Sequence, residues 1–449
     1  MRFVDTLKNI WTIEELRKRI LVTLLLVLVY RLGCYVVLPG VSPSDIDALA
    51  NFTNKSGLMQ LLDMFSGGAF SQASIFALGI MPYITASIVI QLCGMILPSF
   101  QKMQREGESG RQKLNQYTRY LTVLILVLQA PAYLTNLQYQ VAQASHGTVM
   151  AMGFWKIAYL TVILAAGAMF ILWLGERITD RGIGNGISFI ILVGIIARLP
   201  GALYYEFYSR LPGVSGGQGG LVMFIVEIVL LFAVTVMAVL LVQGTRKVPV
   251  QYAKRIVGNR QYGGQRQYIP LKVNAAGVMP IIFAQAIMFI PMALAGFRGG
   301  ESGFMSAFTD INSFWYNLLF FILIVAFTYF YTAITVRPTQ MAEDMKRNNG
   351  FIPGVKPGKK TAEYLDAIMS RITLPGSLFL GIVAILPAFA RFFGISQNFA
   401  QFFGGTSLLI MVGVVLDTLQ QVEAHLKMHH YDGLMKEGKI KGRTTGSAY

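Results

Sequence analysis

The sequence predicts an all-α polytopic membrane protein with ten transmembrane helices. Of its 449 residues, 54% are hydrophobic and 13% are charged, whereas soluble domains carry about 25% charged residues. Long apolar runs recur along the chain, and a helix of about 20 such residues crosses lipid with its backbone hydrogen bonds satisfied. Lys and Arg gather in alternate loops, as the positive-inside rule expects of a multi-span protein.

In chain order, the apolar windows predict spans near residues 20–38, 73–97, 118–138, 154–175, 183–203, 221–243, 274–297, 314–336, 373–392 and 402–423. With ten spans both termini share one side, and the segments on that side hold 30 of the 38 Lys and Arg residues. We therefore expect a cell-membrane protein with cytoplasmic termini. Residues 1–19 are predicted to be an amphipathic segment, and residues 424–449 a cytoplasmic tail.

A division after the fifth span gives an N-terminal half, 20–203, and a C-terminal half, 204–423. Each half contains an odd number of predicted helices, which allows an inverted repeat without proving it. Cys34 and Cys93 fall late in two antiparallel spans and hence at opposite depths, so both are expected to be free thiols.

Two loops, 244–273 and 337–372, are long and hold seven basic residues each. Attraction to anionic lipid is one explanation, and docking of an acidic or RNA-bearing partner is the other. Glycine and aromatic residues are interleaved in NRQYGGQRQY and NNGFIPGVKPG, which predicts shaped hairpins and favours docking.

Motifs of phosphate-binding loops, zinc proteases and serine hydrolases are absent, and the four histidines lie outside the predicted spans. The stretch GIGNG at 182–186 is expected to be a tight turn, because a span follows it directly. The sequence therefore predicts no enzyme, no cofactor and no metal site.

Charges inside the predicted spans are few and lie near span ends: Arg31, Glu227 and Asp417. Such charges can form ion pathways, but their positions favour structural anchoring. A secondary transporter of a small solute would need polar sites at mid-membrane, so this alternative is disfavoured. A structural scaffold is a further alternative.

Several features near the second span predict a pore. Ile80 with Ile84, and Ile187 with Ile191, are pairs four residues apart on helices, although such pairs usually indicate ordinary packing. The preceding stretch SGLMQLLDMFSGGAF is apolar but too short and too glycine-rich to span, so it predicts a half-helix folded into a cavity.

Polar side chains occur in two predicted spans: Thr85, Ser87 and Gln91 in the second, and Asn274 and Gln285 in the seventh. These side chains can form ordinary hydrogen bonds between helices. Since such bonds contribute only about 0.6 kcal/mol on average, they can also form a seam that opens.

Six stretches of the chain resemble the SecY family in order and spacing: SGGAFSQASIFALGIMPYITAS, EGESGRQKLNQYTRY, WLGERITDRGIGNGIS, PLKVNAAGVMPIIFA, FIPGVKPGKKTAEYLDAIMSRITLPGS and FGGTSLLI. The resemblance covers about residues 10–440. It implies two inverted five-helix halves around an hourglass pore that conducts unfolded secretory polypeptides. It also implies a lateral gate that binds signal sequences and releases transmembrane segments into lipid.

The resemblance assigns roles to residues of this chain. A pore ring falls on Ile80, Ile84, Ile187, Ile191, Ile282 and Ile410. A plug falls on about 57–70, including Leu58, Leu61, Leu62, Met64, Phe65, Gly67 and Gly68. The lateral gate is assigned to Thr85, Ser87, Gln91, Asn274 and Gln285.

The resemblance also implies partners: SecE and SecG subunits, the SecA motor ATPase, the ribosome with its nascent chain, unfolded preproteins and membrane lipids. The SecA and ribosome contacts are expected at Lys254, Arg255, Arg260, Lys346, Arg347 and Lys356. At position 356 the family usually has arginine, and lysine keeps the charge but not the planar hydrogen-bonding fork.

Overall fold

The computed structural model describes residues 11, 13–41, 63, 65–144, 153–211, 220–252, 255–257, 260–262, 266–285, 287–288 and 313–436. The chain divides into two compact units, one of Met1–Arg198 with Val414–Tyr449 and the other of Leu199–Gly413. The division into halves at residues 203 and 204 stays a prediction.

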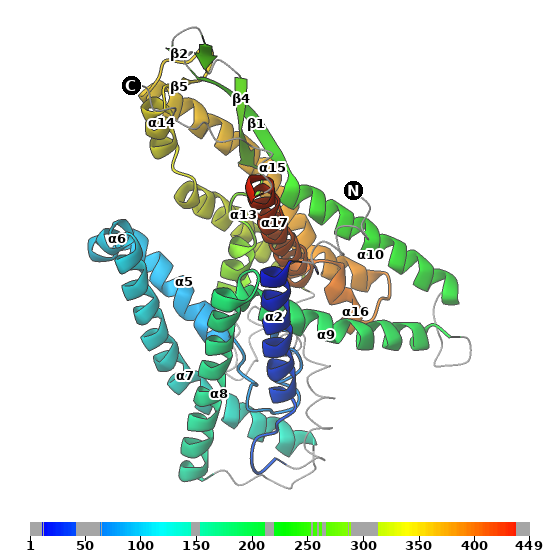
Figure 1. Cartoon of the computed structure of the whole chain (residues 1–449). Coiled ribbons are helices and arrows are strands. Elements are labelled where there is room, and N and C mark those ends of the chain that lie inside the picture. Colours follow the sequence, from blue (N-terminus) through cyan, green and yellow to red (C-terminus); the bar gives the residue numbers. More distant parts are fainter. Residues whose placement is uncertain are drawn as a thin grey trace. The chain divides into compact units, whose positions relative to one another are not determined.

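The first unit is helical among its described residues (Figure 1). Its helices are α2 (Glu14–Gly33), α5 (Met81–Ile96), α6 (Pro98–Arg105), α7 (Glu108–Ala144), α8 (Phe154–Arg181), most of α9 (Gly186–Ser209) and the later part of α17 (Gly405–Lys436). A hydrophobic core joins α7 and α8 to residues 70–77, with Leu134 and Leu160 fully buried. Late α17 contacts the turn between α8 and α9, because Gly184 N–H donates to Gln421 Oε1 at 3.0 Å.

The second unit combines helices with a small sheet (Figure 1). Its helices are α10 (Gly220–Gln243), α13 (Phe314–Thr335), α14 (Pro338–Arg347), α15 (Lys359–Phe392), α16 (Gln397–Ala400), the 3-10 turn η1 (Gln401–Phe403) and an unlabelled helical stretch at 279–285. Its strands are β1 (Thr245–Tyr252), β2 (Arg255–Val257), β3 (Arg260–Tyr262), β4 (Arg266–Lys272) and β5 (Gly350–Phe351).

The two long basic loops form one folded body, here called the loop platform: β1, β4, β5, α14 and the first turns of α15. Strands are ordered β4-β1-β5, all antiparallel, and Gln251 pairs with Phe351 across the two loops. Val248, Val250 and Leu271 pack beneath the sheet against Met345 and Leu365. The predicted hairpin is confirmed for loop 244–273. It is wrong for loop 337–372, which folds as a helix, a short strand and the start of a second helix.

Several predicted spans need correction. The second span begins at Met81 and not at residue 73, because residues 75–80 form turns and Pro82 favours the first turn of a helix. Helix α2 runs without a break from Glu14 to Gly33, so it includes the end of the predicted amphipathic segment and ends before residue 38, where the first span was predicted to end. Span seven is helical only from residue 279, and residues 286 and 289–297 lie outside the described residues.

Among the described residues, seven helices are long and apolar enough to cross a membrane, or eight if the bent pair α5 and α6 forms one span. Helix α10 is strongly apolar, yet only 17% of its most apolar stretch is buried inside the protein. Most of its apolar surface therefore faces outward. Multi-span architecture is therefore confirmed. Cys34 and Cys93 are both free, as predicted.

Candidate functional site

A largely buried stretch, residues 65–80, leads into α5 and is here called the turn segment, because it forms turns except at the helical Phe65 and at Ser74, which bridges to Val37. Ala69, Ala73 and Ser74 are fully buried. Gly67 and Gly68 have φ angles of 67° and 94°, in the left-handed region that glycine adopts without strain. A buried chain outside helices and sheets must find other hydrogen-bond partners, and here the surrounding helices supply them.

Side chains from α2 and α7 bind the carbonyl groups of the turn segment. Tyr30 Oη donates to Ser66 O at 3.2 Å, Arg31 Nη1 to Gly67 O at 2.8 Å, and Tyr133 Oη to Phe70 O at 3.3 Å. Leu38 N–H donates to Ala73 O at 2.9 Å, which adds a backbone contact. Arg31 therefore has the anchoring role that the sequence predicted.

Helix α9 covers another side of the turn segment. A Cβ atom on Gly67 would lie 3.0 Å from the Cα of Gly194, so the two backbones nearly touch. Arg198 forms an ion pair with Asp63 and donates to Ser71 Oγ at 2.9 Å. Asp63 Oδ1 also accepts the backbone N–H of Ser71 at 2.7 Å. Sequence reasoning missed this ion pair, because the partners of Arg198 are far away in the chain.

The structure places four predicted ring residues in the first unit. Ile80 is buried at the N-cap of α5, one position before the helix, and Ile84 is half-buried one turn later. The C=O of Ile80 accepts the N–H of Ile84 at 3.1 Å, so the two residues keep the helical spacing that the sequence predicted. Ile187 and Ile191 lie in the first turns of α9, where Ile191 is 5% exposed and Ile187 lies against Gly175 of α8.

The remaining ring residues belong to the second unit: Ile282 is half-buried and Ile410 is buried. A ring of six therefore stays a prediction. Of the predicted plug residues, Leu58, Leu61, Leu62 and Met64 lie outside the described residues. Phe65 is helical, whereas 66–70, with Gly67 and Gly68, form turns; most of the predicted half-helix lies outside the described residues.

The predicted gate residues of α5 bond within their own helix. Thr85 Oγ1 donates to Met81 O at 3.1 Å, and Gln91 Nε2 donates to Ser87 Oγ at 3.3 Å. In the second unit, Asn274 and Gln285 are buried. Within the described part of the chain, Asn274 Oδ1 has no hydrogen-bond partner. A gate formed by these residues stays a prediction.

The predicted docking residues lie on or beside the loop platform. Lys346 and Arg347 are exposed in the last turn of α14, and Lys356 is exposed in the turn before α15. Arg255 and Arg260 begin β2 and β3, and Lys254 lies outside the described residues.

A second buried ionic cluster lies where α9 ends, and sequence reasoning found only one member of it, Glu227. Arg210 Nε binds Glu206 Oε1 at 3.1 Å, and Arg210 Nη2 binds Glu227 Oε1 at 2.7 Å and Gly394 O at 2.9 Å. Glu206 Oε2 accepts the N–H of Ser396 at 3.1 Å. The cluster ties α9, α10 and the end of α15 together. The described residues contain no group of side chains suited to a metal.

Comparison with known proteins gives consistent results. The SecY family model matches residues 74–419. Protein translocase subunit SecY of Streptomyces galbus is 41% identical over 94% of this chain and 97% of its own length. The SecY subunit of Mycobacterium bovis is 38% identical, covering 97% of this chain and 99% of its own.

Solved structures share the fold at lower identity. A protein-conducting channel is 16% identical with a TM-score of 0.63, covering 91% of this chain and 92% of its own. Sec61 in a canine ribosome–channel complex is also 16% identical, with a TM-score of 0.59 and the same coverage.

Proposed function

The chain belongs to the SecY family, and on this premise we propose how its residues serve a protein-conducting channel. It is a protein translocation channel and not a transporter of small solutes. The observation that best supports our account of its pore is the buried turn segment, residues 65–80. Irregular backbone at membrane depth is tolerated only where protein or a water-filled cavity surrounds it. We assign residues 57–70, which overlap the start of this segment, to the plug that closes the pore.

The six isoleucines, Ile80, Ile84, Ile187, Ile191, Ile282 and Ile410, form an apolar constriction in this proposal. A narrow apolar ring deters ions because water leaves it readily, and flexible side chains can adapt to a passing polypeptide. Ile191 supports the assignment, since it lies one turn before Gly194, which contacts the turn segment.

The lateral gate is assigned to Thr85, Ser87 and Gln91 with Asn274 and Gln285. Because the α5 side chains bond within their own helix, opening a seam beside α5 would break none of those bonds. Asn274 Oδ1, which has no hydrogen-bond partner among the described residues, would be available to an entering signal sequence.

The loop platform is proposed to dock SecA or the ribosome, which supply the driving force, so the chain itself catalyses no bond chemistry and needs no cofactor. The sheet and its core join both loops into one surface and hold its cations in place, which supports a docking role. SecE and SecG are proposed as companion subunits. The platform and both termini would then lie on the cytoplasmic side of the cell membrane.

A photocrosslinking residue at Ile191 tests the pore assignment, with the same residue at Ile225 as the matched control. Ile225 lies on the outward-facing α10 and is 62% exposed. In membranes holding an arrested secretory precursor, we expect a precursor adduct at 191 that requires a functional signal sequence, and none at 225. No adduct at 191 despite confirmed targeting would show that Ile191 is packing alone.

A further inference from the structure

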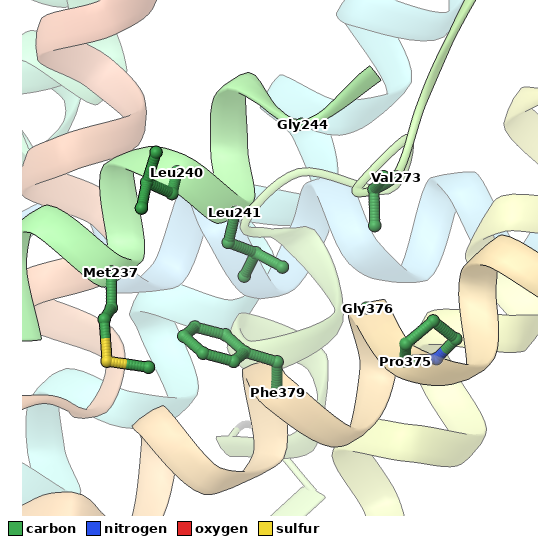
Figure 2. Close-up of a pocket in the computed structure, with 8 residues that line it drawn as sticks. All are labelled: Met237, Leu240, Leu241, Gly244, Val273, Pro375, Gly376 and Phe379. Carbon is green, nitrogen blue, oxygen red and sulfur yellow. The ribbon is translucent and has the colours of Figure 1, made fainter. Parts of the chain in front are cut away.

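An apolar pocket of about 330 Å³ lies within the second unit, between α10 and α15. It is lined by Met237, Leu240, Leu241, Gly244, Val273, Pro375, Gly376 and Phe379. The α10 residues recur at helical spacing and form one stripe. Figure 2 shows Met237, Leu241 and Phe379 directed into the space between the two helices.

Two glycines shape this pocket. A Cβ on Gly376 would lie 3.1 Å from Val273 O, and one on Gly244 would lie 3.4 Å from Val273 Cγ2. The segment around Val273 therefore lies close to both helices and forms the end wall. Met237 and Leu240 are 50% and 65% exposed, so the pocket opens outward along α10.

The pocket lies at the expected membrane boundary. Helix α10 ends at Gln243, and the predicted apolar windows of the next segments begin at residues 274 and 373. All three boundaries meet at the lining residues. Helix α10 is the most apolar of the candidate spans among the described residues. An opening near its end, at the membrane boundary, would face lipid acyl chains toward the membrane interior and lipid headgroups toward the surface.

Three cations lie just beyond the pocket on the headgroup side. Lys272 directly precedes Val273 and stands opposite Thr245 in the sheet, which places it on the same face as Lys247. Arg371 lies one turn before Pro375 on the same face of α15. All three are exposed, and within the described residues none forms an ion pair. Loop 244–273 contains no Asp or Glu.

The pocket is apolar and opens at the expected membrane boundary, where lipid itself can supply an apolar occupant. A single flexible hydrocarbon chain fits the stripe along α10. The cations beyond the end wall match a phosphate group.

We propose that this pocket binds an acyl chain of an anionic phospholipid whose phosphate lies against Lys247, Lys272 and Arg371. The site would hold a lipid at the root of the loop platform, since β1 and β4 begin and end there. Anionic lipid then acts at this one place and is not merely attracted to the basic loops in general.

Lipid crosslinking in nanodiscs tests the proposal with the full chain and its copurifying subunits. A diazirine leucine replaces Leu241 in the pocket, or Leu230 as the control, which is exposed about 16 Å away along α10. The nanodiscs contain phosphatidylcholine with a minor fraction of phosphatidylglycerol, and mass spectrometry identifies the adducts. We expect phosphatidylglycerol to be enriched about fivefold at 241 relative to 230, corresponding to about 1 kcal/mol.

The combined variant Lys247→Gln, Lys272→Gln and Arg371→Gln should abolish this enrichment. The matched variant Lys359→Gln with Lys360→Gln should retain it, because these exposed lysines lie about 24 Å along α15 from Gly376. Equal adducts at 241 and 230 would overturn the proposal, as would enrichment that survives the triple variant. A polypeptide adduct at 241 would assign the pocket to a partner helix and also overturn it.

Discussion

Two arginines, Arg198 within α9 and Arg210 just after its end, are held in opposite ways. Arg198 balances one carboxylate, Asp63, and its side chain is 36% exposed. Arg210 faces two carboxylates, Glu206 and Glu227, and its side chain is only 5% exposed. The guanidinium of Arg198 is partly exposed and can exchange its partner for water although Asp63 is buried, whereas a cluster that is buried on both sides is costly to open. The first therefore suits a contact that must release, and the second suits a permanent one.

What each arginine holds agrees with this difference. Arg198 binds Asp63 and Ser71, which lie within and directly after residues 57–70, the stretch assigned to the plug. Arg210 joins helix ends, reaching Gly394 beside α15 as well as Glu227 in α10. We infer that the Arg198 contacts are a latch and the Arg210 cluster is a staple.

The largest effect is expected from Arg210→Met. The change leaves two buried carboxylates without their counterion, so the free energy of unfolding should fall by about 3–5 kcal/mol. Thermal unfolding in detergent, followed by size-exclusion chromatography, measures it. Arg210→Lys restores the charge without the fork and should recover part of the loss. A melting curve for Arg210→Met that matches the parent would contradict the staple.

Glu227→Gln sharpens the same comparison within the cluster. Glu227 Oε2 has no hydrogen-bond partner among the described residues, and the two carboxylates outnumber the one arginine named with them. Removing this carboxylate's charge should therefore change stability by only about 1 kcal/mol. A loss as large as that of Arg210→Met would show that both carboxylates are required.

Arg198→Gln is expected to lower stability less than Arg210→Met does, but to let ions leak through the channel. The amide can still bond Ser71 but cannot neutralise Asp63, so we expect a loss of about 1–2 kcal/mol and raised ion conductance in planar bilayers. Arg119→Gln is the matched control, because Arg119 pairs with Glu176 at an exposed site. It should change stability by less than about 1 kcal/mol and leave conductance unchanged. Equal leak in both variants would refute the latch.

Ile191→Asn separates the ring from the latch, since Ile191 lies two turns before Arg198 on α9. An amide at the constriction should hydrate it and raise conductance while the Arg198 ion pair stays intact. The control is Ile196→Asn, because Ile196 is 44% exposed on the same helix. Unchanged conductance for Ile191→Asn would remove Ile191 from the ring.

Hydropathy predicted those elements whose position depends on local composition. Span 221–243 is found as Gly220–Gln243, and span 314–336 as Phe314–Thr335. The start of the second span was misplaced because residues 73–80 are as apolar as a helix. Their backbone is instead bound by distant groups such as Tyr133. No window over the sequence contains that information.

Long-range partners explain the other omissions. The loop platform depends on the pairing of Gln251 with Phe351. The latch depends on the hydrogen bond from Arg198 to Ser71, two residues that are 127 positions apart in the chain. Periodicity cannot reveal such pairs. Helical spacing singled out four of the isoleucines beside a predicted cavity, but only the family resemblance added Ile282 and Ile410 and joined all six into one ring.

The smallest effect on the channel itself is expected at Lys356, which lies in neither ionic site and is exposed in the turn before α15, beside the loop platform. Lys356→Arg should be tolerated, because it restores the residue usual in the family and keeps the charge. Lys356→Glu should impair SecA-driven export into membrane vesicles while conductance and melting temperature stay at the parent values, since it reverses a charge on a docking surface without touching latch or staple. Normal export by the glutamate variant would remove Lys356 from the docking surface. A leak would show instead that the platform and the latch are coupled.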